Sequence, residues 1–265
     1  MMLLEQLLEQ YPPPLRGFQE SILKEYLQVR ILALLFEGPA AGKIIFMGGT
    51  ALRLLHGNPR FSEDLGFDNV GLSVGEFQAA GEHLGAALEL EGYSVEVEAR
   101  SLSAHHLQVR FPALLHELGL SPLPGQKIRI QVDSQSQHFA YVPDTPILNR
   151  FDVFSRIRVV PRDLLLSQKL YAALNRKRLM GRDFFDLVFL YGLGVTPHFG
   201  YLEHRLGLAT PAALKSWLLE KTADLDFAAL ARDVEPFLFY PRDRDRVLRF
   251  REFVAGLPGD RGTGR

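Results

Sequence analysis

The feature that most constrains the fold is a short apolar run that ends in two glycines and passes directly into a helical pattern. Residues 43–47 (KIIFM) predict a buried strand, Gly48 and Gly49 end it, and residues 50–56 predict a helix. Glycine lets an anionic group approach the backbone closely, and the first turn of a helix presents unpaired N–H groups and the positive end of its dipole. With the Thr50 hydroxyl beside it, this junction is typical of an anion-binding corner.

A second segment, residues 60–67 (RFSEDLGF), places charged groups a few residues downstream. Arg60 and Ser62 precede Asp64, from which extended backbone is predicted to resume. A carboxylate beside a triphosphate-binding corner is a typical Mg²⁺ ligand. Two plainer interpretations stay open, namely a tight turn at the glycines and an ion pair between Asp64 and Arg60 at the end of a strand.

Composition excludes several classes of protein. The chain has 265 residues, 47% of them hydrophobic, which argues against a disordered chain. The formal net charge of −1 gives no global basic field of the kind that nucleic-acid binding proteins carry. With no cysteine, disulfides, thiolate metal sites and cysteine nucleophiles are excluded, and we expect a cytoplasmic protein. The amino terminus does not resemble a signal peptide, and no apolar run approaches the roughly 18 residues of a spanning helix.

The periodicity of apolar residues predicts an α/β domain over residues 1–157, followed by a helical domain over residues 158–265. Besides the strand and helix at the glycine junction, the first domain is predicted to contain helices at 17–37 and 77–91 and strands at 94–100, 106–111, 127–133 and 156–160. The second is predicted to contain helices at 164–174, 183–190, 211–220 and 241–254.

Three motifs in this chain resemble, in order, those of the AbiEii family of nucleotidyltransferase toxins, a branch of the DNA polymerase β-like superfamily. They are GGTALRLLHGNPRFSEDL, KIRIQVDSQ and PRDLLLSQKLYAALNRKRLMGRDFFDL, and the resemblance covers residues 43–190. It implies a nucleotidyltransferase α/β domain with a mixed sheet, followed by a helical carboxy-terminal domain.

The resemblance also implies which residues form the site. The nucleotide-binding set would be Gly48, Gly49, Thr50, Arg53, Ser62 and Arg182. The catalytic set would be Asp64, Asp133, Lys169 and Asp183. Within it, Asp64 and Asp133 would hold Mg²⁺ or Mn²⁺, and an NTP would be the substrate.

One position departs from the family pattern. The family has Asp-x-Asp where this chain has Asp64-Leu65-Gly66, so the second carboxylate is missing. Residues two apart in a strand lie on the same side, about 6.6 Å from each other, which suits two carboxylates that grip metal ions. Asp68, one step further along, and Asp133, from a neighbouring strand, are the two candidates for its replacement. The departure raises doubt about catalytic strength and leaves the fold unaffected.

Some of these residues also have purely structural interpretations. Asp133 could cap a turn at the end of its strand through Ser134, and Lys169 could reach solvent from an otherwise apolar helical turn. Arg182 and Asp186 are spaced for an ion pair within one helix. These alternatives stay open at the level of sequence.

The implied function is that of a toxin of a bacterial toxin–antitoxin or phage-defence pair. It would transfer a nucleoside monophosphate from an NTP to an acceptor, for which the 3′ end of tRNA is the leading expectation. A cognate antitoxin encoded nearby is the expected partner, with no membrane involved. The alternatives are a catalytically weakened nucleotide-binding or interaction protein of the same fold, and a phosphotransferase or protein nucleotidylyl-transferase.

Overall fold

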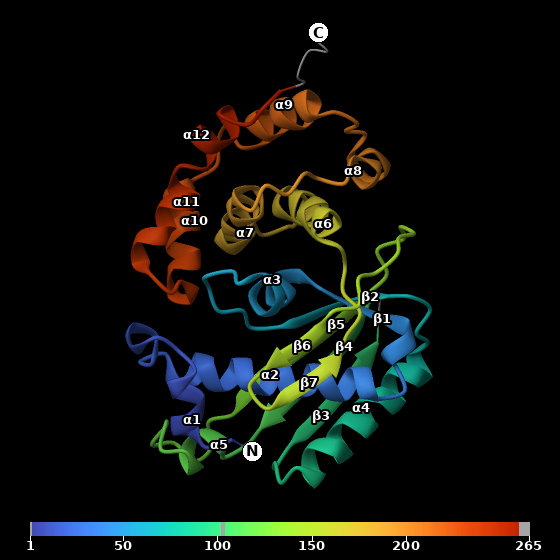
Figure 1. Cartoon of the computed structure of the whole chain (residues 1–265), viewed down its shortest axis with the longest axis vertical. Helices are drawn as coiled ribbons and strands as arrows, with labels where there is room; N and C mark the ends of the chain where they lie inside the picture. Colours follow the sequence, from blue (N-terminus) through green and yellow to red (C-terminus); the bar gives the residue numbers. More distant parts are fainter. Residues whose placement is uncertain (1, 102–103, 260–265) are drawn as a thin grey trace. The chain divides into compact units, whose positions relative to one another are not determined.

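The computed structural model describes residues 2–101 and 104–259, and the chain divides into two compact units (Figure 1). The first unit contains Met1–Gly57 and Phe61–Val160, and the second contains Asn58–Arg60 and Pro161–Arg265. A three-residue piece of the glycine-junction motif therefore belongs to the second unit, although it is surrounded in sequence by the first.

The first unit is built on a five-stranded mixed sheet with the strand order β1-β2-β5-β4-β3. The β2–β5 pair is parallel, and the β1–β2, β5–β4 and β4–β3 pairs are antiparallel. The strands are β1 (Ile44–Met47), β2 (Leu65–Asn69), β3 (Glu96–Ser101), β4 (His105–Phe111) and β5 (Ile128–Gln135). The helices are α1 (Leu4–Glu9), α2 (Gln19–Glu37), α3 (Gly48–His56), α4 (Val74–Leu90) and α5 (Leu114–Glu117), with 3₁₀ turns at Pro13–Leu15 and Ala41–Lys43.

The two faces of this sheet differ in chemistry. Alternate residues of β4 and β5, such as Leu107, Val109 and Ile130, are fully buried beneath α2 and α4. The residues between them, such as Gln108 and Gln131, lie on the opposite face and remain accessible. Because α2 is apolar around most of its circumference, it is buried in the middle of the unit.

The end of the first unit differs from the strand that the sequence predicts at residues 156–160. The chain instead forms a two-stranded hairpin from β6 (Ile147–Arg150) and β7 (Val153–Arg156), and β7 packs against α2. Residues 157–160 are extended, and only Val159 makes a bridge there, in parallel with Phe46 of β1. The segment therefore lines the outer edge of β1 without forming a regular strand.

The second unit is helical. Its helices are α6 (Arg162–Asn175), α7 (Gly181–Gly192), α8 (Phe199–Leu206), α9 (Pro211–Lys221), α10 (Phe227–Val234), α11 (Asp245–Leu248) and α12 (Phe250–Ala255), with 3₁₀ turns at Glu235–Phe237 and Pro241–Arg244. At its core, the ring of Phe184 meets those of Phe227 and Phe250 edge-on, with centroids 5.4 Å and 5.0 Å away. Such contacts add to the hydrophobic gain of burying the rings.

The single helix predicted over residues 241–254 is wrong. The segment is divided into a 3₁₀ turn, α11 and α12, and the second break falls at Arg249, whose φ of −99° and ψ of 20° are not helical. This break redirects the chain so that Phe250 enters the aromatic core, where its side chain is almost completely buried. Tertiary packing has overridden the regular apolar spacing of the segment.

The predicted fold class is confirmed: a mixed-sheet α/β unit is followed by a helical carboxy-terminal region. The strands and long helices around the glycine junction lie within a few residues of their predicted bounds. The sequence patterns missed the β6–β7 hairpin and the short helices α1, α5, α8 and α10. Within the described part of the chain, no helix has both the length and the apolar character needed to cross a membrane.

The close approach of α7 to α10 gives a test of the helical unit. A Cβ atom at Gly181 would lie 1.8 Å from the carbonyl oxygen of Leu230, so Gly181→Ala forces the backbone to move. We expect a loss of about 1–3 kcal/mol in the free energy of unfolding, as is typical of overpacking. Gly192→Ala is the control on the same helix, because a Cβ there has open space. Chemical denaturation should find the control unchanged or stabilised, and equal stabilities of the two variants would contradict this packing.

Candidate active site

The glycine junction has the geometry of an anion-binding corner. Met47 is extended (φ −149°) and Gly48 has a φ of +86°, a value that side-chain-bearing residues rarely adopt, so the chain turns directly from β1 into α3. The side chain of Met47, the residue before α3, makes no capping hydrogen bond. A phosphate at this point could accept hydrogen bonds from the backbone N–H groups of the first turn and would interact favourably with the helix dipole.

Thr50 connects this corner to the segment that carries Asp64. Its side chain is completely buried, its Oγ1 lies 2.8 Å from Ser62 Oγ, and it donates a hydrogen bond to the Asp64 carbonyl oxygen at 2.5 Å. The amide of Gln28 donates to the Ser62 carbonyl oxygen at 2.9 Å and holds the same segment from α2. Thr50 therefore positions Asp64 relative to the start of α3. Its own contribution to nucleotide binding, predicted from the sequence, would come through its backbone N–H.

Three adjacent strands carry a polar row beside this corner. Gly66 of β2 is paired with Asp133 of β5, and Asp133 is paired with His106 of β4. Directly paired residues lie on one face of a sheet, so Asp133 stands beside the position where the family has its second carboxylate. Asp133 Oδ1 lies 2.7 Å from His106 Nδ1 and accepts a hydrogen bond from Gln131 Nε2 at 2.8 Å. Since β5 continues to Gln135, the interpretation of Asp133 as a cap at the strand end is wrong.

Asp64 and Asp133 are the two carboxylates that the sequence predicts as metal ligands. Asp64 immediately precedes β2, two residues before Gly66, and Gly66 pairs with Asp133 of β5. One Mg²⁺ usually takes one or two protein carboxylates and completes its shell with water and phosphate oxygens. No group of three or more acidic, histidine or cysteine ligands occurs in the described residues, so the protein alone offers no complete metal cage.

Asp68, the other sequence candidate for the missing carboxylate, is committed elsewhere. It is only 3% exposed, and its two carboxylate oxygens accept hydrogen bonds from the Gln137 N–H at 2.8 Å and the Tyr141 hydroxyl at 2.7 Å. Burial raises the pKa of Asp68, and the two hydrogen bonds oppose that rise. Asp68 therefore anchors the chain after β5, and Asp133 is the candidate that remains for the replacement of the family carboxylate.

Arg53, which the sequence assigns to nucleotide binding, takes part in a buried cluster on the other side of α3. Its Nε lies 2.7 Å from Glu25 of α2, a carboxylate that is 2% exposed. The same carboxylate accepts hydrogen bonds from Arg150 and, at 2.7 Å, from the Tyr11 hydroxyl. Two arginines therefore contact the one buried carboxylate of Glu25. The cluster fixes α3 onto α2, and so fixes the position of the phosphate corner.

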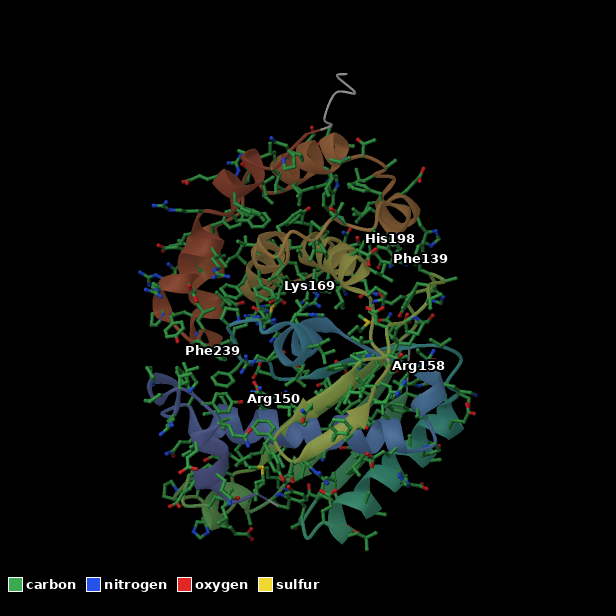
Figure 2. All side chains as sticks on the ribbon, viewed as in Figure 1. Phe139, Arg150, Arg158, Lys169, His198 and Phe239 are labelled. Atoms are coloured by element: carbon green, nitrogen blue, oxygen red, sulfur yellow. The ribbon has the colours of Figure 1, made fainter. Side chains whose placement is uncertain are left out.

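The helical unit contains a second charged cluster, centred on the buried carboxylate of Asp186 in α7. Arg60 donates to both oxygens of Asp186 at 2.7 Å, Asn58 Nδ2 donates at 2.7 Å, and Lys169 Nζ of α6 is 2.8 Å away. Figure 2 labels Lys169. Burial opposes ionisation, but Arg60 and Lys169 hold the pKa of Asp186 at about 2. The partners seen at Asp186 thus come from outside its own helix, and its predicted pair with Arg182 stays a prediction.

Lys169 is shared between two carboxylates, because Asp183 Oδ1 also lies 2.9 Å from Nζ. Its side chain is 10% exposed, so it does not extend into solvent as the structural interpretation supposed. Arg176 is 3.2 Å from the other oxygen of Asp183, and Arg182 lies over the ring of Phe237. The structure thus brings together Lys169, Asp183 and Asp186, and the roles in nucleotide chemistry predicted for Lys169, Asp183 and Arg182 stay predictions.

Sequence reasoning missed three residues of these clusters. His106 carries no local motif, and only the strand register places it beside Asp133. Glu25 lies between the apolar residues Ile22, Leu23, Tyr26 and Leu27 of α2, and this was the one signal that it needed a buried partner. Asn58 precedes Pro59 and reads as a turn residue, whereas its side chain bonds to Asp186.

Comparison with known proteins decides the family. The family whose model matches is described as the nucleotidyl transferase AbiEii toxin of type IV toxin–antitoxin systems, and the match spans residues 30–255. The chain belongs to the AbiEii family. A search of curated proteins returns no match. As an AbiEii protein, the chain is a nucleotidyltransferase by family, and the family's toxin–antitoxin setting implies an NTP substrate and an antitoxin partner.

Two solved structures share the AbiEii fold seen here. JHP933 from Helicobacter pylori aligns with a TM-score of 0.55 and 18% identity, over 89% of this chain and 90% of that one. A protein assigned as a nucleotidyltransferase, also from H. pylori, aligns with a TM-score of 0.54 and 17% identity, over 88% of this chain and 92% of that one. At these identities the likeness shows the fold alone.

The Asp186 cluster predicts how the helical unit responds to acid. A carboxyl group whose pKa is lowered on folding stabilises the protein above its unfolded pKa of about 4, and this contribution is lost as the pH falls through the folded value of about 2. Asp186→Asn leaves Arg60 and Lys169 short of a buried counter-charge and should cost about 3–5 kcal/mol at neutral pH.

Urea denaturation at a series of pH values measures both effects. The wild type should lose stability between pH 4 and 2 more steeply than Asp186→Asn, which has no carboxyl group at this position to protonate. Asp224→Asn, at an exposed position of the same unit, is the control and should follow the wild type. A substitution at Asp186 that costs no more than the control would rule out the buried network.

Proposed function

We propose that this AbiEii protein transfers a nucleoside monophosphate from an NTP to an RNA acceptor, with the 3′ end of tRNA as the leading acceptor. The observation that carries the proposal is the uncapped amino terminus of α3 at Gly48, tied through Thr50 to the segment of Asp64. An anion site and a metal-binding carboxylate held in one rigid frame are what nucleotidyl transfer requires, because its catalysis is mostly positioning and charge neutralisation.

The chain's own residues would divide the work as follows. The backbone N–H groups at the start of α3, from Gly48, Gly49 and Thr50, bind the triphosphate and orient it. Asp64 and Asp133 hold a divalent cation, Mg²⁺ or Mn²⁺, which when bound neutralises charge on the phosphates. His106 and Gln131 hold the Asp133 carboxylate in place, as the partners of metal-binding carboxylates commonly do.

The reaction balances without any further reactant. An acceptor hydroxyl oxygen attacks the α-phosphorus of the NTP, the bond from that phosphorus to the bridging oxygen of the β-phosphate breaks, and pyrophosphate leaves with the bonding electrons. The acceptor proton passes to solvent or to a nearby base. The protein has no covalent step to perform, so its contribution is to align the two reactants.

The remaining predicted site residues keep their assigned roles within the proposal. Lys169, Asp183 and Arg182 would contact or orient the triphosphate, as the family resemblance implies, and Arg53 and Ser62 would support the phosphate corner. The biological setting is proposed on the same basis: a cytoplasmic toxin that acts in phage defence and is controlled by an antitoxin encoded beside it.

The phosphate corner is tested by Gly49→Asp, which places a carboxylate at the uncapped start of α3. Repulsion between this carboxylate and the triphosphate should lower the affinity for an NTP with Mg²⁺ by at least tenfold in calorimetry. Gly42→Asp is the control, because it adds the same charge where a Cβ meets nothing within 4 Å. If the two variants bind NTP with equal affinity, the corner does not hold the phosphates.

The replacement of the family carboxylate by Asp133 is tested in a transfer assay with α-labelled NTP, total RNA and protein. Asp133→Ala should reduce transfer by about 10²-fold or more, as loss of a preorganised charged group typically does. Asp144→Ala, an exposed carboxylate of the same unit, should leave transfer unchanged.

The variant Gly66→Asp, measured in the same transfer assay, tests what the missing family carboxylate contributes. A Cβ at Gly66 would lie 3.4 Å from the Met47 carbonyl oxygen, an ordinary contact, so the variant should fold. If Asp133 already serves the metal, Gly66→Asp changes transfer less than tenfold. A large gain in Gly66→Asp from an almost inactive wild type would instead show that Gly66 has weakened the enzyme.

The molecule that receives the label from α-labelled NTP distinguishes RNA nucleotidyl transfer from the alternative functions. Label on protein rather than RNA would favour a protein nucleotidylyl-transferase. Absence of transfer in both the wild type and Gly66→Asp, with NTP binding retained, would favour a nucleotide-binding protein of this fold. Gly66 is the one observation that supports this second candidate.

A further inference from the structure

The outer edge of the sheet carries a groove that the nucleotidyl-transfer chemistry does not use. β3 is the last strand of the sheet and, among residues 2–101 and 104–259, pairs only with β4, so its other edge offers backbone N–H and C=O groups to a further strand. Between β3 and α4 lies a groove of about 620 Å³. It is lined by Gln78, Gly81, Glu82, Gly85, Ala86, Glu89, Val95, Val97 and Ala99.

The floor of the groove is the apolar face of the sheet, left without cover at its edge. Val97 and Ala99 are partly exposed, whereas Leu107 and Val109, which pair with them one strand further in, are fully buried. A strand added beside β3 would complete the burial of Val97 and Ala99.

Two glycines of α4 give the groove its shape. A Cβ at Gly81 would lie 2.8 Å from Leu107 Cδ2, and one at Gly85 would lie 3.4 Å from Val97 Cγ2. These positions let the helix lie directly on β4 and β3, close to the plane of the sheet. Other residues of α4, among them Glu82, Ala86 and Glu89, form the side wall of the groove.

The side wall is acidic. Glu82 and Glu89 are exposed, and within the described part of the chain neither has an ion-pair partner. By contrast, the charges on the polar face of β3 are neutralised, since Glu96 pairs with Lys127 and Glu98 pairs with Arg110. Glu98 also pairs with Arg100, so the polar face of β3 has no surplus of negative charge. The unpaired acidic side chains of this edge lie on the groove side, where they disfavour nucleic acid and favour a basic ligand.

We propose that this groove binds an extended, basic segment of a partner protein as an additional strand on β3. Successive side chains of the added strand alternate between the two faces of the sheet, so every second one enters the groove. Glu82 and Glu89 are about 10.5 Å apart along the helix axis, and strand residues four apart are separated by about 13 Å. The residues of the bound segment that face the groove are therefore expected to be, at every second position, a lysine or arginine, a small apolar residue, and a second lysine or arginine.

A second copy of this chain fits the groove less well. Pairing of two β3 strands would bring the α4 helix of each copy towards the other, and Glu82 and Glu89 of both would meet across the junction. In such a dimer, the four carboxylates of the two copies would repel one another. A basic segment bound to one copy would instead neutralise the two carboxylates of that copy. The negative charge of the side wall thus favours a basic polypeptide over a second copy of this chain as the occupant of the groove.

The proposal is tested with the full chain and a fluorescent seven-residue peptide, Thr-Lys-Thr-Val-Thr-Lys-Thr, whose lysines and valine share one face. A peptide with both lysines replaced by glutamate is the control ligand. We expect saturable binding of the lysine peptide alone in fluorescence anisotropy. Amide hydrogen exchange should slow over residues 95–101 of the β3 edge and not elsewhere in the sheet.

Two variants locate the binding site. The double variant Glu82→Lys, Glu89→Lys should weaken binding of the lysine peptide by about tenfold or more, while Glu9→Lys, Glu117→Lys, with the same change in net charge at exposed positions, should not. Ala86→Trp fills the groove and should abolish binding, while Ala79→Trp, exposed on α4 outside the groove, should bind as the wild type does.

Equal binding to the wild type and to the Glu82, Glu89 double variant would overturn the proposal, as would the absence of binding. A wild-type chain that elutes as a dimer, with residues 95–101 already protected and Ala86→Trp monomeric, would show that a second copy occupies the groove instead. NTP affinity serves as the folding control for all variants, because none of the substituted residues lies at the α3 corner.

Discussion

The buried hydroxyl of Thr50 holds the two halves of the nucleotide site in one frame. It links the first turn of α3 to the backbone of Asp64, while Gln28 fixes the same segment from α2 and the cluster around Glu25 fixes α3 itself. The phosphate corner and the metal-binding segment are thus held by buried hydrogen bonds, which are costly to break because the freed groups would stay unsatisfied. Preorganisation of this kind matters most for a reaction whose catalysis is positioning.

The sheet register shows which residue stands beside the position where the family has its second carboxylate. Gly66 of β2 replaces that acidic residue, Asp68 of the same strand is buried and hydrogen-bonded, and the parallel neighbour β5 places Asp133 opposite Gly66. His106, from the third strand of the row, orients that carboxylate. The helical unit uses charge differently: Asp186, Asp183, Lys169 and Arg60 neutralise one another in a buried network that joins α6, α7 and the Asn58–Arg60 segment.

Much of this was predictable from sequence, for physical reasons that also mark where prediction failed. The strand, double glycine and helix at residues 44–56 follow from local backbone preferences. The family could be identified because three of its motifs occur in order in the sequence. The partners of Asp68, Glu25 and Asp186 depend on contacts between residues far apart in the chain, which no local pattern encodes. The same is true of the break at Arg249, which only the aromatic core around Phe250 explains.

We propose that a nucleoside monophosphate is transferred and that Asp64 holds the metal for this step. The most direct measurement is a paired incubation with RNA, one with NTP labelled at the α-phosphate and one with NTP labelled at the γ-phosphate, using the wild type and Asp64→Asn. We expect that RNA gains the α-label only, and that Asp64→Asn abolishes this gain while the protein stays folded. Incorporation of the γ-label would show a phosphotransferase, and undiminished α-label transfer by Asp64→Asn would contradict the assignment of the metal-binding carboxylate.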